Sequence, residues 1–192
     1  MADEWLAKVQ KKPVGPRIGS WIGAAICALG ISVCLTIVVL GGQRIMDAGG
    51  FVASGGPYQI AHPVPPGFWI QPLAFVGLFA FSIAHAIFAS RIKAPGLIYA
   101  IWCVLWTAVG AMTFWNGLHP PRGNGLAWGW LIMGGVFLLV GLGSIAAYFA
   151  TQNLFDWAHS EMSIRQLVVY WTITITAVLV GVPLGIAALA AV

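Results

Sequence analysis

The segment Gly42–Gly67, GQRIMDAGGFVASGGPYQIAHPVPPG, decides the fold because it separates two long apolar runs. It contains two charged side chains, Arg44 and Asp47. Long loops without secondary structure are usually functional or disordered, and disordered segments are normally charged and poor in apolar residues. Because this segment is largely apolar, we expect an ordered cap, spanning residues 42–67, that lies on one face of a membrane domain.

The composition on both sides of this segment excludes a soluble protein. Of the 192 residues, 60% are hydrophobic and 7% are charged, whereas soluble domains average about 25% charged residues. So few charges cannot cover a water-exposed surface, and we therefore expect a polytopic integral membrane protein in contact with a lipid bilayer. The nine Lys and Arg residues form no basic stripe, so nucleic acid is not an expected partner.

Five apolar runs approach or exceed the roughly 20 residues that a helix needs to cross the hydrocarbon core. Backbone groups cannot remain unpaired in lipid, and the runs lack the alternation of barrel strands, so each is predicted to be an α-helix. The first run is longer than the core of a signal peptide and is therefore expected to be retained. The predicted all-α fold has spans at 18–41, 68–90, 97–118, 128–151 and 167–192.

The distribution of basic residues predicts the orientation. With the N-terminus inside, seven of the nine Lys and Arg residues fall in inner segments, and Arg44 and Arg122 fall in outer ones. The positive-inside rule then predicts a cytoplasmic N-terminus, an external C-terminus and a location in a bacterial-type inner membrane. Residues 1–17 are expected to form a cytoplasmic amphipathic segment with lysines facing anionic headgroups. The alternative is a frayed tail whose charge cluster serves only to set the orientation.

Three further patterns predict local structure. Small residues every fourth position, as at Ser82, Ala86 and Ser90, allow a neighbouring helix to approach closely. Since the following loop is short, we expect the second and third spans to pack as an antiparallel hairpin. Ser163 and Gln166 have the spacing of a capping box, which predicts a helix start at this point.

His85 is the one histidine within the predicted spans. Its distance from the short loop places it level with Trp102, so we expect contact with Trp102 or Trp106 and a hydrogen bond to its ring nitrogen. A functional interpretation makes His85, Trp102 and Trp106 a haem or quinone site. The alternative is a neutral structural histidine bonded to a neighbouring helix.

His62 and His119 both lie in predicted outer loops, and each precedes a proline. Two imidazoles from separate loops could bind a metal such as copper or zinc, provided that further ligands complete the site. The alternative is that each His-Pro pair only forms a rigid turn, because proline fixes its own φ and restricts the conformation of the preceding residue.

The sequence contains no phosphate loop, no HExxH motif and no serine–histidine–acid arrangement with a buried acid, so the signal for an enzyme is weak. Three functions stay open. The first is a non-catalytic accessory subunit of a larger membrane complex, respiratory or otherwise energy-converting. The second is a quinone-binding or haem-binding electron-transfer subunit, and the third is a small-molecule channel or transporter with a thin path of threonines.

For the accessory subunit, apolar residues of the outer cap are the expected docking surface, because exposed apolar patches usually mark a partner. The cap residues predicted to contact another membrane subunit are Phe51, Tyr58, Ile60, His62 and Val64.

Overall fold

The protein is seen in a computed structural model that describes residues 18–47, 67–94, 98–120, 125–150 and 162–192. The regular elements within these ranges are α-helices: α2 (Ile18–Asp47), α3 (Ile70–Ile92), α4 (Ile98–Leu118), α5 (Trp128–Ala150) and α6 (Ile164–Ala190). Each contains an apolar stretch long enough to cross a membrane. Within the described residues, the predicted all-helical structure with five helices long and apolar enough to span a membrane is therefore confirmed.

The boundary of the first helix differs from the prediction. α2 continues to Asp47, six residues beyond the expected end at residue 41. Side-chain contacts explain this extension, because the Nε2 atom of Gln43 donates to the Oδ1 atom of Asp47 one turn later, at 2.6 Å. The first six residues of the predicted cap are thus helical, and residues 48–66 lie outside the described residues.

α6 starts three residues before the predicted span 167–192, at the position that the capping box predicts. Ser163 is its N-cap, and Ser163 and Gln166 form the predicted capping box in both directions. The helix therefore begins at Ile164 and contains Pro183 within its length.

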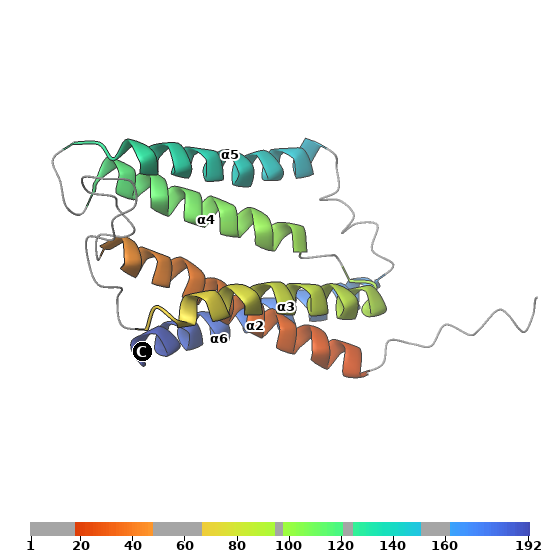
Figure 1. The fold of residues 1–192 in the computed structure, drawn as a ribbon. Coiled ribbons are helices and arrows are strands. Elements are labelled where there is room, and N and C mark those ends of the chain that lie inside the picture. The colour runs from red at the N-terminus through yellow and green to blue at the C-terminus, as the bar shows by residue number, and fades with distance from the viewer. Residues whose placement is uncertain (1–17, 48–66, 95–97, 121–124, 151–161) are drawn as a thin grey trace, which may run out of the picture.

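The five helices alternate in direction (Figure 1). Consequently α2, α4 and α6 end where α3 and α5 begin, at what we call the Asp47 end, and the opposite side is the Ile18 end. Ile18 and Val192 therefore lie at opposite ends of the bundle. Trp69, Trp115 and Trp128, each 59–67% exposed, mark the Asp47 end, as expected for aromatic residues at a membrane interface.

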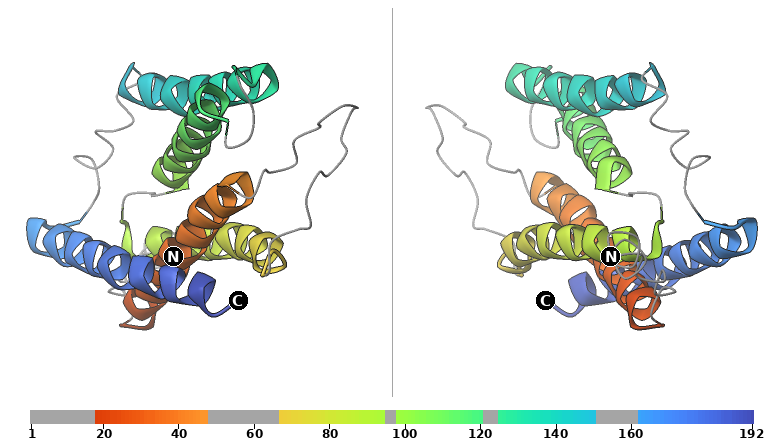
Figure 2. Two further views of the ribbon diagram at one scale, coloured as in Figure 1. Left: turned by 90° about the vertical axis from the view of Figure 1, so that its left-hand side faces the viewer. Right: turned by 90° about the vertical axis from the view of Figure 1, so that its right-hand side faces the viewer.

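The helices form two groups (Figure 2). α2 packs against both α3 and α6, whereas α5 packs against α4 and, within the described residues, has no other substantial helix contact. The predicted antiparallel contact of α3 with α4 is therefore present but small. The two helices meet at Phe79 and Trp102, whose ring centroids lie 4.7 Å apart, but each has its main partner elsewhere.

Glycines explain why α3 prefers α2. A Cβ atom added at Gly23 or Gly30 of α2 would lie 2.7 Å from the ring of Phe88 or Phe81 of α3. The two phenyl rings therefore occupy hollows that only glycine leaves open, and this close approach stabilises the antiparallel pair.

α2 and α6 form a parallel pair that also depends on glycines for close approach. Gly181 and Gly185 of α6 are four residues apart, and added Cβ atoms there would lie 2.6 Å and 2.7 Å from the Cβ atoms of Ser32 and Thr36. This is the small-xxx-small spacing that brings membrane helices together.

α4 and α5 are joined by a seam in which glycines alternate with larger residues. Along each helix the seam positions are spaced by three and four residues, which places them on one face. Each glycine of the seam meets a larger residue on the other helix, so that the surfaces interlock. The facing pairs are Thr107 with Gly141, Gly110 with Leu138, Phe114 with Gly134, and Gly117 with Leu131.

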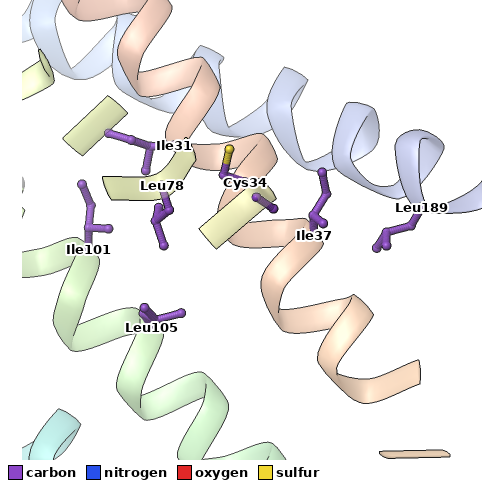
Figure 3. Close-up of a cluster of buried hydrophobic side chains, with 8 residues drawn as sticks. Ile31, Cys34, Ile37, Leu78, Ile101, Leu105 and Leu189 are labelled. Carbon is purple, nitrogen blue, oxygen red and sulfur yellow. The ribbon is translucent and has the colours of Figure 1, made fainter. Parts of the chain in front are cut away.

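The central core lies where four helices converge (Figure 3). Ile31 and Cys34 of α2, Leu78 of α3 and Leu105 of α4 point toward one another, with Leu189 of α6 nearby. Leu78 is 0% exposed and Leu105 1%. This cluster joins the α4–α5 pair to the rest of the bundle.

Candidate functional site

Two groups of polar side chains that connect different helices lie among the described residues, and the first surrounds His85. This histidine is 1% exposed and lies on α3, about seven residues from its end at Ile92, which corresponds to roughly 10 Å along the helix. Its Nε2 atom lies 3.5 Å from the hydroxyl oxygen of Tyr170 on α6. Tyr170 is also 1% exposed, so the two rings form a buried polar contact between α3 and α6.

The ring partner of His85 therefore differs from the expected one. Trp102 is level with Phe79, six residues before His85, and Trp106 contacts Phe137 of α5 with ring centroids 5.0 Å apart. The expectation assumed that α3 and α4 run side by side from their short connection. Because α4 instead pairs with α5, α6 supplies the residue beside His85.

Ser82 completes this group of polar residues. It precedes His85 by three residues on the same face of α3 and is likewise 1% exposed. Its Oγ atom has no hydrogen-bond partner in the described protein. We call Ser82, His85 and Tyr170 the buried polar centre.

The arrangement limits what His85 can bind. An axial bond from Nε2 to a haem iron would require Tyr170 to move away, and a quinone headgroup would need an opening that these enclosed side chains do not offer. The buried polar centre is suited to hydrogen bonding with a neighbouring helix or with a very small ligand. Among the described residues no group of three His, Cys, Asp or Glu side chains gathers that could hold a metal ion.

His119 has a local partner at the end of α4. Its ring lies 4.2 Å from the ring of Trp115, and its Nδ1 atom is 3.3 Å from the carbonyl oxygen of the same residue. These contacts are typical of a side chain that closes a helix C-terminus. His62, its predicted metal-binding partner, lies outside the described residues, as do Phe51, Tyr58, Ile60 and Val64.

The second polar group lies at the Asp47 end and was not predicted. Asn116 of α4 is 4% exposed, and its Nδ2 atom donates to the Oε1 atom of Gln43 at 3.2 Å and to the carbonyl oxygen of Met112 at 2.8 Å. Gln43 in turn donates to Asp47, so a short chain of hydrogen bonds ties α4 to α2. The sequence did contain a signal for this group, because the Asn116 side-chain amide lies at the same membrane level as the end of the first predicted span.

Arg44 belongs to the same end of the bundle. Its guanidinium donates to the carbonyl oxygen of Leu189, near the C-terminus of α6. A cation at this position satisfies a terminal carbonyl and complements the helix dipole. Arg44 therefore links α2 to α6.

A groove of about 380 Å³ lies between α2 and α6 and is lined mainly by aliphatic side chains. Thr172 and Thr176 are on its wall, but the Thr172 hydroxyl donates to the carbonyl oxygen of Val168 one turn earlier. Thr107 and Thr113 are on α4, in the other helix group. The threonines considered for a transport path are thus distributed over separate helices.

The surface of α5 opposite its seam is apolar and open. Ile132, Val136 and Leu139 are 66%, 49% and 75% exposed. A Cβ atom added at Gly135 or Gly143 would meet nothing within 4 Å. These five residues follow a spacing of three or four along the helix, and we call them the free face of α5.

Comparison of the chain with protein-family models, with curated proteins and with solved structures found no match.

Proposed function

We propose that this chain is a non-catalytic subunit of a larger membrane assembly, which binds a transmembrane helix of a partner protein through the free face of α5. The observation that carries this proposal is the pair of glycines on that face, Gly135 and Gly143, where an added Cβ atom would meet nothing within 4 Å in the described protein.

Glycine inside a helix lowers stability by roughly 0.5–1 kcal/mol relative to alanine. Gly134 and Gly141 offset this cost because each receives a residue of α4 in the seam. No such contact exists for Gly135 and Gly143. An approaching helix would give these two glycines a packing role.

Membrane helices associate mainly through close packing, because lipid tails are as apolar as the helix surface. A glycine-containing face allows the backbones to approach, whereas a purely aliphatic face is well solvated by acyl chains. α6 illustrates the second kind, since both of its glycines face α2 while Val168, Ile175 and Leu179 are exposed. The contrast favours α5 as the docking helix.

The buried polar centre is consistent with a structural role for His85, because its neighbour is a protein hydroxyl. The electron-transfer and transport hypotheses receive no comparable support from the described residues.

Photo-crosslinking in native membranes tests the proposal. A photoreactive amino acid at Leu139, on the free face, should give a protein adduct of one defined mass. The same amino acid at Leu179 on α6, 69% exposed, should give adducts with lipid. If the two positions give the same adducts, or if Leu139 reacts with lipid alone, the proposal is wrong.

Two double variants then test whether Gly135 and Gly143 are needed for docking. Gly135→Ile with Gly143→Ile should abolish the protein adduct from Leu139, because the branched side chains prevent close approach. Gly135→Ala with Gly143→Ala adds single methyl groups and should retain most of it. Equal adduct yields from the two double variants would contradict a role for the glycines.

A further inference from the structure

The hydroxyl of Ser82 differs from most of the hydroxyls in the described spans. Serine and threonine in a helix commonly donate to the carbonyl oxygen one turn earlier. Thr36, Thr113, Ser144, Thr172 and Thr174 all do so, at 2.6–3.0 Å. The Ser82 Oγ atom makes no such bond, although the residue is 1% exposed.

A buried hydroxyl without a partner is costly. Bulk water does not reach the hydrocarbon core, so polar groups there must be satisfied within the protein or by ordered water. Ser82 is therefore either a local defect or one side of a binding site.

The neighbours of Ser82 favour a binding site. His85 is one turn further along the same face, and Tyr170 reaches it from α6. The separation of 3.5 Å between the Tyr170 hydroxyl and Nε2 of His85 is longer than the usual hydrogen-bond range of about 2.5–3.2 Å. The direct contact between His85 and Tyr170 is therefore long, and the Ser82 Oγ atom beside His85 on the same helix face has no partner in the described protein.

We propose that Ser82, His85 and Tyr170 bind one internal water molecule inside the membrane domain. Buried waters typically make about three hydrogen bonds, and here the Ser82 hydroxyl is the group that has no other partner in the described protein. Water also both donates and accepts, so it suits two hydroxyls and an imidazole in either tautomer. Larger ligands are excluded because all three residues are enclosed by the helices.

The bound water links α3 to α6. Both helices pack mainly against α2, and their direct contact is confined to a small region that includes His85 and Tyr170. A bridging water adds hydrogen bonds to the contact between His85 and Tyr170. The site is independent of the docking face on α5.

Thr107 provides a matched control. Its Oγ1 atom is also buried without a hydrogen-bond partner, but it lies against Gly141 in the α4–α5 seam, a glycine that offers no polar side chain. We therefore infer no water there. Removing the Ser82 hydroxyl should therefore lower the stability of the protein, whereas removing the Thr107 hydroxyl should not.

Thermal unfolding of purified protein in detergent distinguishes these cases. Ser82→Ala should lower the Tm by about 2–4 °C, which corresponds to roughly 1 kcal/mol for a chain of this size. Thr107→Val should leave the Tm unchanged or raise it. An unchanged or raised Tm for Ser82→Ala would overturn the proposal, since it would mean that the hydroxyl is an unsatisfied group or bonds its own helix.

Hydroxyl-radical labelling by X-ray radiolysis gives a direct readout, because radicals formed from a bound water modify adjacent side chains. Tyr170 should be labelled in the wild-type protein despite its burial, and Ser82→Ala should remove that labelling while the variant stays folded. Absence of Tyr170 labelling in the wild type, or labelling that Ser82→Ala leaves unchanged, would contradict the water site.

Discussion

The Tyr170 hydroxyl oxygen on α6 lies 3.5 Å from Nε2 of His85 on α3, and both residues are 1% exposed. Two helices that each pack chiefly against α2 are thereby joined by a polar contact within the membrane. The contact gives His85 a partner that is 85 positions away in the chain. The contribution of this contact to the free energy of unfolding can be measured by substituting the two residues.

Tyr170→Phe should destabilise the protein by about 1 kcal/mol, because it removes the hydroxyl beside a buried imidazole. In a double-mutant cycle with His85→Leu, the coupling energy should be close to 0.6 kcal/mol, the average found between side chains of membrane helices. Unfolding in mixed micelles measures both quantities. Strictly additive effects of the two substitutions would show that the residues do not interact.

The adjacent glycines of α5 should respond oppositely to alanine. Gly134→Ala places a methyl group against the backbone of Phe114 and should cost about 1–3 kcal/mol, as overpacking usually does. Gly135→Ala meets no atom within 4 Å and should be neutral or stabilise the isolated protein by up to about 1 kcal/mol. Unfolding of both variants in detergent tests this prediction. Equal destabilisation would argue against the seam.

Asn116→Ala should weaken the attachment of α4 to α2. The substitution removes donors to Gln43 and Met112 and leaves the Gln43 oxygen unpaired, which should cost about 1–3 kcal/mol. Thr113→Val is the control, because the Thr113 hydroxyl bonds within α4 and makes no bond to α2. Unfolding measurements that give Thr113→Val an equal or larger loss of stability would contradict the link.

Cysteine labelling of intact cells tests the orientation. Lys93 and His119 are exposed at opposite ends of the bundle, whereas the native Cys27, Cys34 and Cys103 are buried and should not react. The distribution of basic residues predicts that Lys93→Cys is protected until the membrane is permeabilised, and that His119→Cys reacts from outside. The reverse pattern would invert the predicted orientation. Labelling of both from one side would contradict the alternating helices.

The sequence by itself determined which segments are helices. Long apolar runs must be helical because lipid offers no hydrogen bonds to the backbone, and this physical requirement depends on local composition alone. The start of α6 was likewise predictable, since the Ser163–Gln166 capping box involves residues three positions apart. The extension of α2 to Asp47 was not predicted, although the Gln43–Asp47 hydrogen bond in its last turn is local; the bond from Asn116 to Gln43, in contrast, joins residues that are distant in the sequence.

The choice of helix partners was decided by the tertiary structure. A short connection brings the ends of α3 and α4 together, but it does not make their axes pack. Phe81 and Phe88 fit against Gly30 and Gly23 of α2 instead. Which glycine receives which side chain depends on the shapes of both surfaces, so Tyr170 emerged as the neighbour of His85 only when the helices were in place.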